Sequence, residues 1–164
     1  MSTRVIGVGS PFGDDRAGWE VAAALEATLR SAGVSSLRIE IHACDRPGAA
    51  LVRLLAGVQH AVIIDAALSA GSRAGSIRWL GDHEIAARRA VSSHGFGLAE
   101  ALALARALGD APSRVSVLAI STTHLDGEAL SDPVRAAVPV AVQEILTHIR
   151  RHDRDVRGRI IRTE

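Results

Sequence analysis

The sequence predicts an α/β protein, a three-layer αβα sandwich around a mixed, mostly parallel sheet of about five strands. Short apolar runs alternate with amphipathic helical patterns in the order βαβαββαβα, which is typical of strands joined by helical crossovers. A chain of 164 residues that is 48% hydrophobic can also bury one sizeable core. We therefore expect a single domain over residues 1–150, followed by a basic, flexible tail over residues 151–164.

The first half of the chain contains two strand patterns with a helix between them. An apolar strand over residues 5–8 runs into a glycine-rich turn, and a helix follows over about residues 15–31, ending at Gly33. The second strand is expected over residues 37–43, with a short helix after Pro47. Together these segments predict the beginning of a parallel sheet.

The second half begins with a fully apolar run over residues 61–64, which is typical of a strand buried on both faces. The connection to the next strand, over residues 76–80, is too short for a helical crossover, so that strand is expected to be antiparallel or at an edge. A helix with an inward stripe that includes Leu98 and Leu108 precedes the last strand, over residues 115–120. A final helix is expected to start at the pair Asp132-Pro133.

Charge and cysteine content exclude several classes of partner and compartment. A net charge of +1 gives no electrostatic reason to expect a nucleic-acid or membrane-surface partner. The single cysteine, Cys44, excludes an intramolecular disulfide and suits a reducing compartment. No signal peptide and no apolar run of about 18 residues is present, so we expect a cytoplasmic protein.

Polar side chains follow two of the expected strands. Asp14 and Asp15 come after the first strand, and a single acid would suffice as a helix N-cap. Asp65 follows the apolar run 61–64, and His94 lies in a glycine-rich loop before a helix. If the first and third strands are parallel neighbours, their carboxyl ends lie only about 5 Å apart.

Two carboxylates and an imidazole form a mixed oxygen and nitrogen set that suits a borderline divalent metal. General acid–base catalysis without a metal is the alternative role for Asp15, Asp65 and His94. Each also has an ordinary structural interpretation: Asp15 as a helix N-cap, Asp65 as a strand-end turn and His94 as a helix cap.

A dinucleotide site is not predicted, because Phe12 occupies the position where the third glycine of the fingerprint would follow Gly7 and Gly9. Cys44 is more typical of a small buried hydrophobe than of a nucleophile. No serine or cysteine has a histidine base at a recognisable spacing, which disfavours a covalent route. We expect no organic cofactor.

Three motifs in this order, GVGSPFGDD, VIIDAA and SSHGFGLAEAL, make the chain resemble the nickel–iron hydrogenase maturation endopeptidases over residues 5–149. The resemblance implies an αβα sandwich and an aspartic-type endopeptidase that removes a C-terminal extension from the hydrogenase large-subunit precursor once nickel is in place. By motif, it implies that Asp15, Asp65 and His94 sense the nickel and form the catalytic site. The nickel is then expected to arrive with the substrate.

The chain departs from the family pattern in its loops. Ser10 and Arg16 stand where the family usually has asparagine and glycine, and residues 44–48 and 121–127 differ from the usual motifs. Asp45 is the nearest equivalent of a family aspartate after the second strand, and His124 is a further candidate ligand. Two rival functions follow: a non-catalytic metal-sensing or precursor-binding module, and a small-molecule hydrolase on a similar scaffold.

Overall fold

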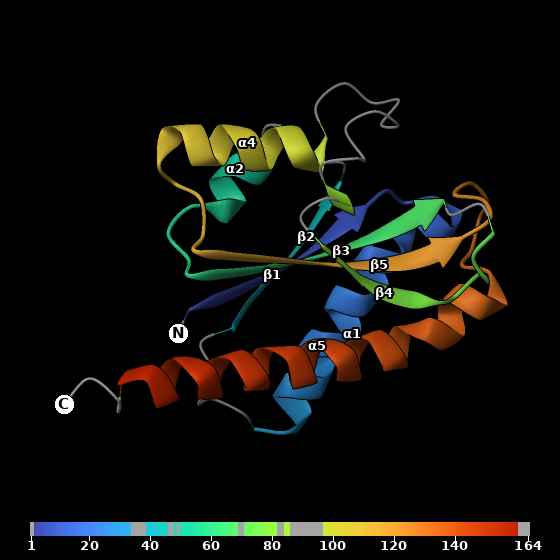
Figure 1. Cartoon of the computed structure of the whole chain (residues 1–164). Coiled ribbons are helices and arrows are strands. Elements are labelled where there is room, and N and C mark those ends of the chain that lie inside the picture. Colours follow the sequence, from blue (N-terminus) through green and yellow to red (C-terminus); the bar gives the residue numbers. More distant parts are fainter. Residues whose placement is uncertain are drawn as a thin grey trace.

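The computed structural model describes residues 2–33, 39–45, 48, 50–68, 71–81, 84–85 and 97–160, with side chains described as far as residue 153. Its centre is a five-stranded sheet in the order β2-β1-β3-β5-β4, with helices on both faces (Figure 1). The strands are β1 (Thr3–Gly9), β2 (Ile39–Asp45), β3 (His60–Leu68), β4 (Ile77–Leu80) and β5 (Arg114–Thr122). The helices are the 3-10 helix η1 (Gly13–Arg16), α1 (Ala17–Ser31), α2 (Ala50–Leu55), α4 (Leu98–Leu108) and α5 (Asp132–Ile160).

The strand pairing confirms the predicted mixed, mostly parallel sheet. β1 pairs in parallel with both β2 and β3, and β3 pairs in parallel with β5. β4 pairs antiparallel with β5 at the edge of the sheet, as its short connection from β3 predicts. β1 and β3 are therefore adjacent and parallel, which is the arrangement on which the proposed site depends.

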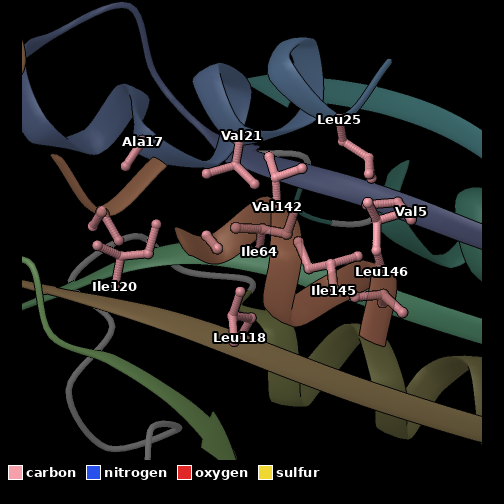
Figure 2. Close-up of a cluster of buried hydrophobic side chains, with 14 of the residues drawn as sticks. Val5, Ala17, Val21, Leu25, Ile64, Leu118, Ile120, Val142, Ile145 and Leu146 are labelled. Atoms are coloured by element: carbon pink, nitrogen blue, oxygen red, sulfur yellow. The ribbon is translucent and has the colours of Figure 1, made fainter. Parts of the chain in front are cut away.

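Two apolar cores lie on the two faces of the sheet. Alternate residues of each strand point to opposite faces, so Val62 and Ile64 face α1 and α5 whereas Ile63 faces α2 and α4. Figure 2 shows the first core, in which side chains of α1 and α5 pack against those of β1, β3 and β5. Its labelled members are Val5, Ala17, Val21, Leu25, Ile64, Leu118, Ile120, Val142, Ile145 and Leu146.

Several element boundaries differ from the sequence-based expectations. β3 does not end at Asp65 but continues to Leu68, because β5 also continues and Leu68 pairs with Thr122. Backbone hydrogen bonds to a neighbouring strand do not depend on side-chain polarity, so an acid inside a strand is no stop signal. Leu108 was expected to be buried but is 59% exposed, in the last turn of α4.

α5 is longer than expected. It begins at Asp132, as the Asp-Pro pair predicts, and continues to Ile160, into the region assigned to the tail. The flexibility of residues 151–164 stays a prediction. In the part of the chain that the structure describes, no helix is both long enough and apolar enough to cross a membrane.

The glycines Gly7 and Gly18 allow α1 to lie directly on the sheet. A Cβ at Gly7 would overlap the carbonyl oxygen of Gly18, and a Cβ at Gly18 would overlap the carbonyl oxygen of Val8 and lie 2.7 Å from that of Ile64. The start of α1 is therefore packed backbone to backbone against β1 and β3. This contact places η1, which immediately precedes α1, at the carboxyl ends of these strands.

The substitution Gly18→Ala should lower the free energy of unfolding by about 1–3 kcal/mol or more, because backbone atoms cannot give way to the added methyl group. Gly81→Ala is the matched control, since among the described residues a Cβ there meets only the Glu84 carboxylate, at 3.8 Å. Urea unfolding of both variants measures the difference. Equal stability of the two variants would contradict the close packing of α1.

A cluster of aromatic and polar side chains lies at the amino end of β3, far along the sheet from η1. His60 is fully buried, and its Nε2 lies 3.0 Å from Ser116 Oγ, which also lies 2.8 Å from His148 Nε2. The His148 ring stacks on Trp79 at 4.0 Å between centroids and meets the edge of His152 at 4.4 Å.

Burial, together with the neighbouring histidines and arginines, lowers the pKa of His60 to about 3 and that of His148 to about 4. Both rings are therefore neutral at pH 7.

Acidification should destabilise the protein from pH 6.5 downward. An unfolded histidine has a pKa near 6.5, so between pH 6.5 and about 4 the unfolded chain binds more protons than the folded one. The contribution of these neutral rings to the free energy of unfolding is thus fully present above pH 6.5. It decreases as the pH falls, with a slope approaching about 1.4 kcal/mol per pH unit for His60 alone. Urea unfolding between pH 7.5 and 5.5 measures the slope.

His148→Gln is the informative variant, because glutamine keeps a hydrogen-bonding group near Ser116 but cannot titrate. It should reduce the slope, because the variant removes one of the two titrating rings that contact Ser116. An equal slope in wild type and His148→Gln would show that this cluster does not control the acid response.

Candidate active site

The proposed site begins with the turn that joins β1 to η1. Gly9 ends β1, and a Cβ at this position would overlap the carbonyl oxygen of Asp15. The amide of Ser10 donates to this same Asp15 oxygen at 3.4 Å. Because Gly9 has no side chain, η1 folds back directly over the carboxyl end of β1.

The loop after β5 holds η1 from its other side. The amide of Gly13 donates to the Gly127 carbonyl at 2.7 Å, and the amide of Asp15 donates to the Leu125 carbonyl at 3.2 Å. Gly13 has φ of +44°, and a Cβ there would overlap the Asp126 carbonyl. Glycine is therefore required at position 13 both by its backbone conformation and by the close approach of this loop.

The two adjacent acids of η1 have different environments. Asp14 is 1% exposed, and its Oδ2 accepts hydrogen bonds from Thr122 Oγ1 at 2.5 Å and Ser131 Oγ at 2.8 Å, while Oδ1 accepts from the Ser131 amide at 2.7 Å. Burial by itself raises the pKa of Asp14, but the hydrogen bonds from Thr122 and Ser131 outweigh it and hold this pKa below its usual value. Asp15 is only half-buried, so it is the acid of the pair with exposed surface.

Asp65 lies in β3 at the same end of the sheet. It follows Ile64, which pairs with Gly7 of β1, and it is half-buried. By strand alternation Asp65 faces α2 and α4, as do Ile63 and Ala67. Asp65 thus lies inside β3 and not in a turn after it, whereas Asp15 lies in η1, which follows the carboxyl end of the neighbouring strand β1.

His94 lies outside the described residues, so its position is not part of this geometry. α4, the helix that follows it, begins at Leu98 on the face of the sheet that Asp65 shares. Gly97 is the N-cap of α4, and its amide donates to the Glu100 carboxylate at 3.1 Å.

Over the described ranges, no group of three or more His, Cys, Asp or Glu side chains is arranged to hold a metal ion. The cluster of His60, His148 and His152 is also not arranged to hold a metal ion. Two of its Nε2 atoms instead contact Ser116 Oγ. The convergence of Asp15, Asp65 and His94 on one ion stays a prediction.

The residues that depart from the family pattern are placed around this end of the sheet. Arg16 Nε lies 3.4 Å from Glu20 Oε1, one turn along α1. Asp45 ends β2 opposite Gly9, and His124 is exposed in the loop after β5. The sequence did not reveal that Thr122 and Ser131 anchor Asp14; the only signal was that two consecutive acids exceed what one helix cap requires.

The fold and this site define a class: an α/β protein whose candidate catalytic acids lie at the carboxyl edge of a mostly parallel sheet, where ligands of such folds bind. A family model described as hydrogenase maturation protease matches residues 46–148, and the chain belongs to this family. The resemblance seen in the sequence is therefore confirmed, and the protein is a peptidase by family.

Solved structures agree with this assignment. The hydrogenase maturating endopeptidase HybD from E. coli is 26% identical, with a TM-score of 0.79 over 93% of this chain and 94% of that one. The [NiFe] hydrogenase maturation protease HybD from Thermococcus kodakarensis is 25% identical, with a TM-score of 0.66 over 90% and 98% of the two chains. HycI from the same organism, at 19% identity, 88% and 89% coverage and a TM-score of 0.62, shares the fold. The comparison with curated proteins returned no match.

Cys44 should not act as a nucleophile. Burial raises the pKa of its thiol, and its carbonyl accepts a hydrogen bond from Trp19 Nε1 at 2.9 Å, which ties this part of β2 to α1. The thiol should therefore react with iodoacetamide more slowly than free cysteine at pH 7.5, because only the thiolate reacts. Cys44→Ala should keep full peptidase activity, and loss of activity in the folded variant would restore the covalent route.

Proposed function

We propose that this protein removes a C-terminal extension from a nickel-loaded hydrogenase large-subunit precursor. Membership of the hydrogenase maturation protease family supports the reaction class. The observation that supports the proposal is that η1, which contains Asp15, follows the carboxyl end of β1, while Asp65 lies in β3, the parallel neighbour of β1.

In this proposal Asp15, Asp65 and His94 contact the nickel ion of the precursor. Two half-buried carboxylates at one end of a sheet repel each other, and a cation between them relieves this repulsion. Two oxygen ligands and one nitrogen ligand leave coordination positions for groups of the precursor, whereas permanent structural sites are usually closed and four-coordinate. Nickel is therefore part of the substrate.

Hydrolysis then needs an activated water molecule. The nickel of the substrate can assist the attack of water by polarising either the water or the scissile carbonyl. Alternatively, an aspartate can accept the proton of the water as a general base. Both routes need the same side chains. We place the reaction in the cytoplasm, because a protein whose single cysteine is free suits a reducing compartment.

The rival function is a non-catalytic module that binds the precursor or senses its metal without cutting. It is motivated by Arg16 and by the unusual loops at residues 44–48 and 121–127. In the described part of the site, Arg16 of η1 forms an ion pair with Glu20 of α1, which gives no specific support to this function.

The test compares nickel-loaded with nickel-free large-subunit precursor in a gel-shift assay for loss of the C-terminal extension. Wild type should cut only the nickel-loaded form. Asp15→Asn, Asp65→Asn and His94→Ala should each lower the cutting rate by at least about a hundredfold, the scale expected for loss of a group that takes part in the reaction. Asp126→Asn, an exposed acid in the loop after β5, is the matched control and should retain the wild-type rate.

The stability of Asp65→Asn separates a functional acid from a structural one. If Asp65 is held beside Asp15 for function, removing its charge should leave the melting temperature equal or higher while cutting is lost. Equal cutting of both precursor forms by wild type would refute nickel recognition. Binding of the precursor without any cutting would support the non-catalytic module instead.

A further inference from the structure

Asp14 connects three segments that are distant in the sequence. Its carboxylate in η1 accepts hydrogen bonds from Thr122 at the end of β5 and from both the amide and the hydroxyl of Ser131, the residue before α5. The amide of its neighbour Asp15 bonds to Leu125 in the loop between these two anchors. One side chain and the adjacent backbone thus hold η1 against the same loop.

A buried carboxylate of this kind is more than the start of a helix requires. An isolated buried charge is costly, and it is tolerated only where hydrogen bonds replace its water. Both Asp14 oxygens have such partners, whereas an exposed serine or aspartate would cap a helix without this cost. Arg16, the N-cap residue of α1, forms no side-chain capping hydrogen bond. Asp14 therefore does not serve as the cap of α1; its hydrogen-bond partners lie at the end of β5 and directly before α5.

The geometry of η1 indicates what the hydrogen bonds between Asp14, Thr122 and Ser131 fix in this turn. A 3-10 helix has three residues per turn, so consecutive side chains project about 120° apart. With the Asp14 side chain fixed toward Thr122 and Ser131, the rotation of η1 about its own axis is fixed as well. The direction of Asp15 follows from that rotation, and it differs from the direction of Asp14.

We propose that Asp14 is a positioning residue, which presents the Asp15 carboxylate at the carboxyl ends of β1 and β3 by anchoring η1 to Thr122 and Ser131. The inference rests on the proposed function in one respect, namely that Asp15 contacts the reacting centre. Asp14 itself touches neither the substrate nor its nickel.

The variants separate the anchor from the rest of the fold. Asp14→Asn keeps the shape of the side chain but removes its charge. Thr122→Val removes one hydroxyl at nearly constant volume, and Thr122→Ser keeps that hydroxyl. Asp126→Asn, in the same loop, is the control, and thermal unfolding with circular dichroism establishes that each variant is folded.

The first readout is amide hydrogen exchange, which needs no substrate. Exchange at Gly13 and Asp15 should accelerate by at least about tenfold in Asp14→Asn and Thr122→Val, because local opening of η1 becomes easier. Exchange at Ala101, whose amide bonds to Gly97 in α4, should not change. Wild-type exchange at Gly13 and Asp15 in both variants would overturn the proposal.

The second readout is cutting of nickel-loaded precursor. At saturating precursor, the rate constant should fall by at least about tenfold in Asp14→Asn and Thr122→Val, since a displacement of about 1 Å can cost a hundredfold. The half-saturating concentration should change by less than about threefold, because docking of a protein substrate is spread over a large interface. Thr122→Ser should restore the rate to within about threefold of wild type.

A lower melting temperature with an unchanged rate constant per folded molecule would show a merely structural role and overturn the proposal. Failure of wild type to cut any precursor would refute the proposed function and not the anchoring. In that event the exchange rates at Gly13 and Asp15 alone decide whether Asp14 holds this turn.

Discussion

The architecture at the functional end of this protein depends on backbone contact between α1 and the sheet. Gly7 and Gly18 leave no room for a Cβ, so the first turn of α1 lies with its backbone directly against β1 and β3. η1 precedes α1 without a break and is carried to the same place. An acid in η1 and an acid in β3 are thereby brought to one edge, although they are far apart in the sequence.

The neighbouring acids Asp14 and Asp15 have carboxylates in different environments. Asp14 is buried and bound by Thr122 and Ser131, so its charge is used inside the protein. Asp15 is held by its backbone amide, which leaves its half-buried carboxylate available for other contacts. The two acids have the same chemistry but different environments: Asp14 is buried among hydroxyl and amide donors, whereas Asp15 is half-buried.

The two ends of the sheet carry polar groups of different character. At the carboxyl end, a charged carboxylate is stabilised by hydroxyl and amide donors. At the amino end, His60 and His148 share the Ser116 hydroxyl, and burial keeps both rings neutral. The first cluster lies beside the proposed reaction, whereas the second holds the later part of α5 against β3, β4 and β5.

The sequence by itself predicted the fold class, an antiparallel or edge position for β4 and the family, because apolar periodicity, connection lengths and local motifs are properties of the chain. The parallel pairing of β1 with β3 was only a condition of the site prediction, and the tertiary structure established it. The sequence also predicted that Asp15 and Asp65 meet at one end of the sheet, and this convergence stays a prediction. It misplaced Asp65 after β3, because strand length depends on the partner β5. Only the tertiary structure decided which acid of the first loop is buried, since the donors on Thr122 and Ser131 are more than a hundred residues away in the sequence and are brought to Asp14 by the fold alone.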